Sequence, residues 1–221
     1  MNTQAILDFL NELSKNNNRE WFNENKPRYQ ELYQSMVLFS EMVINEVKTF
    51  DSSVAGIEPK KSVFRIYRDV RFSKDKSPYK TNMGMFITPG GKNAGMAGYY
   101  LHLEPTQSFI AGGIYMPPSK QLNAVRREIF NNASEFKEII EDAGFKEYYG
   151  ELQGEKLKRN PKDFPADFEE IELLKFKSYI VSHNFTNEDL KSPDFFGKVI
   201  DGFETLHPFN RYLNQALLTL S

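Results

Sequence analysis

The chain has 221 residues, of which 26% are charged and 40% hydrophobic, a composition typical of a folded globular protein rather than a disordered one. Its formal net charge of −2 argues against a general nucleic-acid coat, which needs a basic surface. The absence of cysteine excludes disulfides and thiolate catalysis, and it removes the commonest zinc and iron–sulfur sites. The length predicts a single domain over residues 1–221.

The amino terminus and the apolar runs indicate where the protein resides. The opening MNTQAILDFL has no basic segment, and no apolar run in the chain reaches the roughly 20 residues that cross a bilayer. We therefore expect no signal peptide, no membrane partner and a cytoplasmic location.

Apolar residues at helical spacing predict helices in the first 50 residues. Thr3 is expected to cap the first helix, Asn18 a second one at REWF, and Pro27 to begin a long third one. Trp21 is expected to fill the joint between two helices. The less favoured alternative is a stacking surface beside the basic segment that follows.

The segment from Val63 to Ile87 concentrates the chemistry of the chain. Its first half alternates apolar and polar residues, which predicts a strand with two different faces. One face carries Phe64, Ile66, Arg68, Val70 and Phe72, and the other carries Arg65, Tyr67, Asp69 and Arg71. The following SKDKSPYKTN predicts a loop that adds Lys74, Lys76 and Lys80.

Three further strands are expected at 83–88, 97–104 and 108–116, joined by short turns. Residues 62–116 are thus predicted to form a four-stranded antiparallel meander, with another strand at 177–185. Gly112-Gly113 indicates a bulge or a close backbone approach. The connection PGGKNAG matches neither a P-loop nor a dinucleotide fingerprint, so we interpret it as a mobile hairpin tip and identify no cofactor.

Helices are predicted to dominate the second half of the chain. They are expected to begin at Ser119, at Ser134 (ending at Gly144), at Asp167, at Pro193 and again at Pro208. Residues 150–165 predict a loop with a second cationic cluster, formed by Lys156, Lys158, Arg159 and Lys162. Helices before and after an antiparallel sheet predict the α+β class, with N-terminal, middle and C-terminal helices packed on the sheet.

Four stretches of the sequence carry a resemblance to a known family. They are NNNREWF, FRIYRDVRFSKDKSPYKTN, LKRNPKDF and ELLKFKSY. Together they resemble domain of unknown function 2461, a family of conserved hypothetical proteins found mainly in bacteria. Asp163 departs from the family pattern, in which Gly is expected after Pro-Lys. The resemblance implies a single α+β domain and no particular reaction.

Metal and nucleophilic catalysis find little support in the residues. His102 and Glu104 share a strand face with Tyr100, but two ligands do not make a zinc site, so His102 is predicted to be a hydrogen-bonded structural residue and no metal is expected. No G-x-S-x-G elbow occurs. Asp69 could act as a base only poorly between cations, so we interpret it as a counter-ion for Arg65 and Arg71.

Anion recognition is the hypothesis that the basic segment favours. Arg65 and Arg71 with Tyr67 between them form a row with strand neighbours about 7 Å apart, and the loop lysines could close over a phosphorylated or carboxylated small molecule. The candidate ligand-binding residues are Arg65, Tyr67, Arg68, Asp69, Arg71, Lys74, Lys76, Tyr79 and Lys80. An enzymatic role is left open.

Two alternatives remain beside this hypothesis. Phe64, Tyr67, Phe72 and Tyr79 interleave with cations, as stacking residues do in proteins that bind single-stranded nucleic acid. The charged row could instead be a non-catalytic interaction or scaffold surface, in which Arg68 needs an acid or carbonyl partner at the edge of the core.

Overall fold

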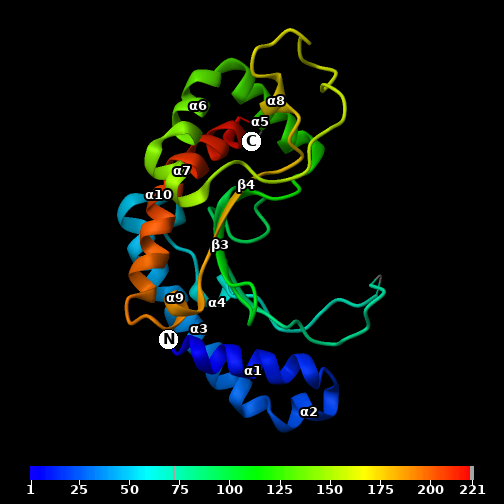
Figure 1. Ribbon diagram of the computed structural model, residues 1–221, viewed down its shortest axis with the longest axis vertical. Coiled ribbons are helices and arrows are strands. Elements are labelled where there is room, and N and C mark those ends of the chain that lie inside the picture. The colour runs from blue at the N-terminus through cyan, green and yellow to red at the C-terminus, as the bar shows by residue number, and fades with distance from the viewer. Residues whose placement is uncertain (72, 220–221) are drawn as a thin grey trace.

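The computed structural model describes residues 1–71 and 73–219, and within them one antiparallel sheet organises the chain (Figure 1). Its strands lie in the order β1-β2-β3-β4. They are β1 (Met83–Ile87), β2 (Gly98–Leu103), β3 (Phe109–Ile114) and β4 (Tyr179–Asn184). The first three follow one another along the chain, whereas β4 joins β3 after a long helical excursion. The predicted α+β class is confirmed.

The predicted first strand of the meander is wrong. Residues 63–71 and 73–82, here called the arm, leave the sheet as a long protruding loop (Figure 1). Its two limbs meet at one isolated antiparallel bridge, Tyr67 with Tyr79, which is flanked by hydrogen bonds from Arg68 N–H to Pro78 O (3.0 Å) and from Lys80 N–H to Ile66 O (2.8 Å). Because Pro78 has no N–H to donate, a regular ladder cannot form there. Only an isolated bridge, Val63 with Met85, ties the first limb to β1.

The alternation predicted for this segment does occur, although in an arm rather than a strand. Ile66 is buried, Phe64 and Arg68 are half-buried, and Arg65 and Tyr67 are exposed. Phe72, which was predicted to share the apolar face, lies outside the described residues. The two limbs of the arm therefore present one sheltered side and one solvent side.

The N-terminal helices are α1 (Thr3–Lys15), α2 (Arg19–Glu24) and α3 (Lys26–Phe50). Asn2 rather than Thr3 caps α1, because its side chain accepts from Ala5 N–H (3.0 Å) while the Thr3 hydroxyl donates to the Leu190 carbonyl. Trp21 packs on Phe9 with ring centroids 5.8 Å apart, which confirms its position between α1 and α2.

The middle and C-terminal helices differ from prediction at Gly144, Asp167 and Pro208. The helix that was expected to begin at Asp167 begins at Ile171 instead. The elements are α4 (Pro59–Ser62), α5 (Ser119–Asn131), α6 (Ala133–Glu141), α7 (Ala143–Tyr149), α8 (Ile171–Leu174), α9 (Asn187–Lys191) and α10 (Phe195–Leu218). Gly144 lies inside α7 instead of ending α6, since Asp142 caps a new helix by accepting from Phe145 N–H (2.9 Å). The predicted restart at Pro208 is also wrong, and α10 continues through it. Residues Phe203 and Phe209 on either side are fully buried, so packing offsets the lost hydrogen bond.

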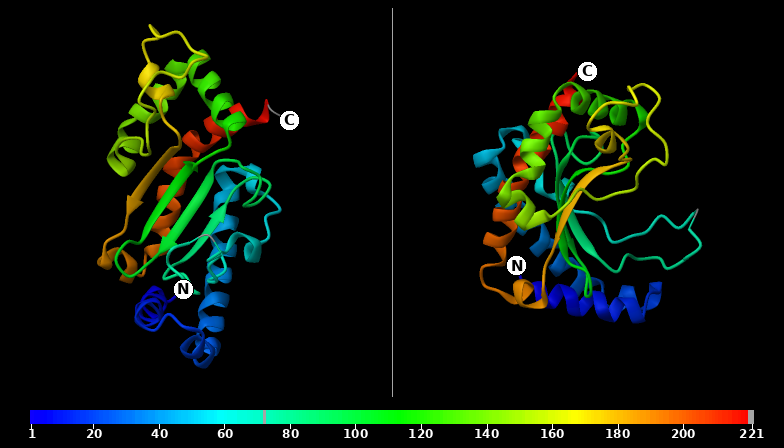
Figure 2. Two further views of the ribbon diagram at one scale, coloured as in Figure 1. Left: turned by 90° about the vertical axis from the view of Figure 1, so that its right-hand side faces the viewer. Right: turned by 45° about the horizontal axis from the view of Figure 1, so that its top comes forward.

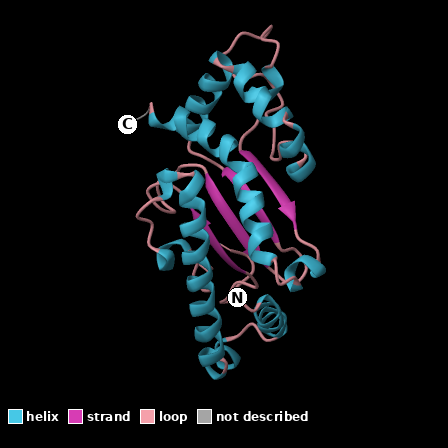
Figure 3. Ribbon diagram, turned by 90° about the vertical axis from the view of Figure 1, so that its left-hand side faces the viewer, coloured by secondary structure: helices cyan, strands magenta, loops and turns pink. Residues whose placement is uncertain are grey.

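The two faces of the sheet have different neighbours. Helices α3 and α10 lie across one face (Figure 3), which we call the covered face, while the centre of the opposite face has no helix over it (Figure 2, left) and is called the open face. Covered-face residues such as Met85, Leu101 and Val181 are fully buried. At Gly112 a Cβ would collide with Leu206 of α10, which confirms the predicted close approach.

Buried residues from α1 to α10 form a single apolar cluster. Whether the chain is one domain over 1–221 stays a prediction. Among the helices of residues 1–71 and 73–219, none combines the length and apolar content needed to cross a membrane.

Candidate anion-binding site

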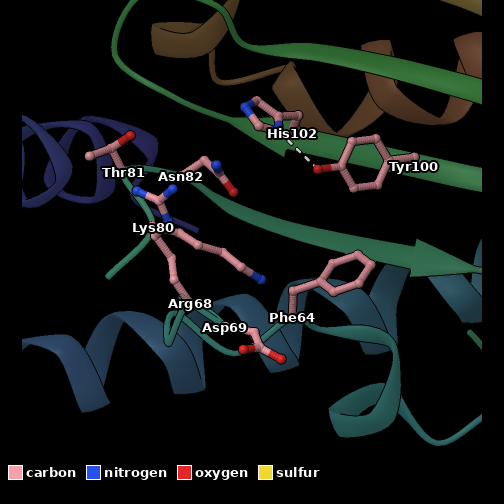
Figure 4. A pocket seen from close by; sticks show the side chains of 8 residues that line it. All are labelled: Phe64, Arg68, Asp69, Lys80, Thr81, Asn82, Tyr100 and His102. Carbon is pink, nitrogen blue, oxygen red and sulfur yellow. Dashed lines mark hydrogen bonds between the residues drawn. The ribbon is translucent and has the colours of Figure 1, made fainter. Parts of the chain in front are cut away.

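A pocket of about 520 Å³ lies between the arm and the open face of the sheet (Figure 4). The lining residues come from the two limbs of the arm and from β2. They are Phe64, Arg68, Asp69, Lys80, Thr81, Asn82, Tyr100 and His102. In Figure 4, Arg68 reaches towards Thr81 and Asn82, and the Lys80 side chain extends towards Phe64.

The arm is held in place by contacts with the N-terminal helices. The Asn17 side chain donates to the Tyr79 carbonyl (3.0 Å) and accepts from the Tyr79 N–H (3.1 Å), so one amide replaces a neighbouring strand. The Tyr79 ring stacks on Phe22 of α2 at 3.9 Å and 18°. These contacts bury Tyr79 and fix the limb that carries Lys80.

Two half-buried lysines, Lys80 and Lys92, lie on the ring of Phe64. Their ammonium nitrogens are 5.4 Å and 4.5 Å from its centroid, and they donate only to the carbonyls of Arg65 (3.1 Å) and Val63 (2.8 Å). No carboxylate in residues 1–71 or 73–219 lies within ion-pair distance of either lysine.

Burial and mutual repulsion act on the pKa values of this pair. The pKa of Lys80 is lowered from its usual value, mainly by burial and further by Arg65. Burial likewise lowers the pKa of Lys92, and the charge of Lys80 adds to the effect. Carbonyl oxygens solvate an ammonium group but do not neutralise it, so the site carries uncompensated positive charge.

The arginines of the arm, in contrast, have acidic partners. Arg68 is half-buried and pairs with Asp75, as its predicted need for an acid partner requires. Asp69 forms an ion pair of 2.6 Å with Arg71, and hydrogen bonds from Arg71 lower the pKa of Asp69, with a smaller effect of Arg65. Asp69 is therefore a counter-ion for Arg71, as predicted, whereas its predicted pairing with Arg65 is reduced to a weaker electrostatic effect.

A hydrogen-bonded chain of three side chains runs along β2 on the open face. The Tyr100 hydroxyl is 2.8 Å from His102 Nδ1, and His102 Nε2 is 3.1 Å from Glu104, which also accepts from Thr81 (3.0 Å). With Glu104 ionised, Nε2 carries the proton and Nδ1 accepts from Tyr100. Burial raises the pKa of Tyr100 to about 12, so the phenol is neutral near neutral pH. His102 is thus a hydrogen-bonded structural residue, as predicted.

The structure brings only part of the predicted site together. Arg68, Asp69 and Lys80 line the pocket. The predicted row of Arg65, Tyr67 and Arg71 is exposed on the arm and does not line it. The remaining predicted residues lie apart from it too, because Lys74 and Lys76 are exposed and Tyr79 is buried against α2. The predicted residues are divided in this way because the first limb of the arm pairs with the second limb instead of joining the sheet as a strand.

The comparison with protein families agrees with the sequence motifs. The family of conserved hypothetical proteins called DUF2461 matches residues 5–212. The chain belongs to this family. No curated protein and no solved structure matches the chain.

The match to DUF2461 includes the arm, the pocket and most of α10. Pocket residues that the sequence hypothesis omitted are Phe64, Thr81, Asn82, Tyr100 and His102, together with the neighbouring Lys92. The strand alternation of GYYLHLE does place Tyr100, His102 and Glu104 on one face. Within the described stretches of this DUF2461 chain, no three His, Asp or Glu side chains gather as metal ligands would.

Proposed function

We propose that the protein binds a small anionic molecule, a phosphate or a carboxylate, in the pocket between the arm and the open face. The observation that carries this proposal is the half-buried pair Lys80 and Lys92, which has carbonyl partners but no carboxylate partner among the residues that the structure describes. A bound anion would supply the missing charge. The volume of the pocket, about 520 Å³, lies within the range of small-molecule sites.

Neighbouring side chains could orient an anion that is bound at the two lysines. Asn82 lines the pocket and offers an amide donor to an anion, whereas the Tyr100 hydroxyl already donates to His102 and has no second proton to offer. Arg68 lines the same pocket but is already paired with Asp75, so Lys80 is the better primary contact. We assign no reaction to the site, because the neutral phenol and the paired Asp69 are both poor bases near neutral pH.

A thermal-shift titration with inorganic phosphate, ethyl phosphate and propionate tests the proposal. At a ligand concentration one hundred times Kd, binding adds about 2.7 kcal/mol to the free energy of unfolding. The double variant Lys80→Gln/Lys92→Gln should lose this stabilisation, whereas Arg65→Gln, an exposed cation outside the pocket, should keep it. Equal responses of the two variants would overturn the assignment.

The other two hypotheses draw less support from the geometry. Stacking on single-stranded nucleic acid needs open rings. Of the three described rings of this set, Tyr79 is buried, Phe64 is half-buried and Tyr67 is 45% exposed, and Phe72 lies outside the described residues. A gel shift at two salt concentrations tests nucleic-acid binding, since phosphate contacts weaken steeply with salt. A scaffold role stays a prediction, and it requires that no anion stabilises the protein.

A further inference from the structure

A second hollow, which we call the groove, continues the anion pocket along the open face. Its volume is about 630 Å³, and Phe64 and Tyr100 line both spaces. From these two residues it crosses the sheet to Ile180 on β4. Four strands about 4.8 Å apart make this path roughly 14 Å long. The groove is therefore elongated and begins where the anion pocket ends.

The floor of the groove combines aromatic rings with small residues. Tyr100 makes edge contacts with Phe86 and Phe109 at centroid distances of 6.5 and 5.8 Å. Ala111 lies opposite Tyr100 in the register of β2 and β3, and Gly113 is close by. Gly113 is required by its backbone, with φ of +104°, but Ala111 has no such constraint. The small side chain of Ala111 leaves depth at the centre of the floor.

The far rim of the groove presents apolar side chains to solvent. Tyr115 and Met116 are 72% and 70% exposed, and Pro117 and Pro118 follow them. Met116 has φ of +44° and is the one non-glycine residue with positive φ in the described part of the chain. Its N–H donates to Ser178 (2.9 Å), which helps to hold this strained conformation. Strained backbone and exposed apolar side chains beside a hollow are typical of binding sites.

The near end of the groove is cationic. Lys92 lines it, with the ammonium group over the Phe64 ring, and Lys80 lies over the same ring from the anion pocket. The remaining wall is mostly apolar, through residues such as Met96 and Ile180. Positive charge at one end and apolar surface along the rest are complementary to a molecule with an anionic group at one end and an apolar chain.

We propose that the ligand is a monomeric amphiphile, an anionic head group bearing one alkyl or acyl chain. The head lies at Lys80 and Lys92, and the chain lies along the groove over Ala111 towards Ile180. This inference rests on the proposed anion site and adds the class of molecule that fills it. An elongated groove open to solvent favours a flexible chain over a bulky ring system.

Three probes separate the head from the chain: ethyl phosphate, octyl phosphate and octyl glucoside, each used below its micelle concentration in calorimetric titrations. Octyl phosphate should bind at least tenfold more tightly than ethyl phosphate, because burial of about two additional methylenes gives that gain. Octyl glucoside, which lacks the charge, should bind at least tenfold more weakly than octyl phosphate.

Two matched variants test the path of the chain. Ala111→Phe fills the floor and should abolish the advantage of octyl over ethyl phosphate while ethyl phosphate still binds. Ala166→Phe, the same change at an exposed position outside the groove, should leave both affinities unchanged. If Ala111→Phe does not fold, Ile180→Thr shortens and polarises the far wall, and it should lower octyl phosphate affinity several-fold without affecting ethyl phosphate.

The outcomes distinguish this inference from the anion site on which it rests. Equal affinities for ethyl and octyl phosphate would overturn the amphiphile and leave the anion site standing. No binding of either phosphate would remove both. Equal binding of octyl glucoside, or co-sedimentation with anionic phospholipid vesicles without binding of monomeric octyl phosphate, would also overturn the proposal, the latter in favour of a membrane surface.

Discussion

The covered face and the open face of the same four strands differ in how deeply their side chains are buried and in the kinds of residue that they carry. On the covered face, alternate residues pack against helices, chiefly α10, and side chains such as Tyr99, Leu101 and Ile110 are fully buried. On the open face, the alternate residues are half-buried rings, small residues and the chain from Tyr100 to Glu104. One strand thus carries fully buried side chains on one side and the groups of the candidate site on the other. Substitutions that differ by a single position should therefore separate the two properties.

The largest expected loss of folding stability is for a substitution on the covered face. Leu101→Ala should lower the free energy of unfolding by about 2–5 kcal/mol, because it leaves a cavity among residues that cannot close over it. Denaturant unfolding measures the loss. The affinity of the folded fraction for ethyl phosphate should not change, and a weaker affinity would show that the two faces are coupled.

A smaller loss of folding stability is expected at Gly112, where the backbone of the sheet contacts α10. Gly112→Ala places a methyl group against Leu206 and should cost about 1–3 kcal/mol through overpacking. The neighbouring Ala111→Ser, which faces the other way, serves as the control and should cost less than the Gly112 change. Equal melting temperatures for the two variants would contradict the assignment of faces.

Breaking the hydrogen-bonded series Tyr100–His102–Glu104 on the open face should lower the free energy of unfolding by a still smaller amount. Tyr100→Phe removes the hydroxyl that donates to His102, and we expect a loss of about 0.5–1.5 kcal/mol. The imidazole then loses its partner on Nδ1, so the NMR signals of its ring should move towards those of a free histidine. Unchanged His102 signals would show that the hydrogen bond does not form in solution.

For the lysine pair, the expected change in stability without ligand is the smallest. Lys80→Gln/Lys92→Gln should leave the free energy of unfolding within about 0.5 kcal/mol of the parent or raise it, because two half-buried, mutually repelling charges are removed. Thermal denaturation at low salt checks the sign. A clear destabilisation would mean that the carbonyl contacts of the lysines support the fold, and the anion site would lose its main argument.

The pH dependence of anion binding tests the role of the two lysines independently. Since the folded pKa values of Lys80 and Lys92 lie below the ordinary value, the unfolded chain holds more protons between the two values, and the ligand-free protein gains stability as pH rises through that window. Bound phosphate favours the charged lysines, so its stabilising effect should decline over this window. Lys80→Arg/Lys92→Arg should move the decline to higher pH in thermal-shift titrations, and an unmoved decline would exclude the lysines as its cause.

Patterns that are local in the sequence predicted much of the fold. The cap at Asn18, the long helix from residue 26, the four strands of the sheet and the acid partner of Arg68 all follow from residues within about ten positions of one another. The arm could not be predicted in this way, because the Asn17 side chain that replaces a strand neighbour is 62 positions from Tyr79.

The candidate site was only partly predictable for a similar reason. Lys92 lies in a hairpin whose glycines indicated a mobile tip, yet its ammonium group reaches the Val63 carbonyl, 29 positions earlier. The alternation of β2 separates Tyr99 from Tyr100 but does not say which of them the helices cover. That choice depends on where α10 lies, and hence on Gly112 and Leu206.

The amide of Asn17 has a consequence for any shortened form of this protein. Asn17 and Phe22 line neither hollow, yet they hold the limb that forms one wall of the anion pocket. A fragment without the first 25 residues would retain every lysine and ring of the pocket but lose the support of that wall. If the pocket binds an anion as proposed, a genetic or proteolytic cut between the N-terminal helices and the sheet should weaken that binding although it removes no residue that lines the pocket.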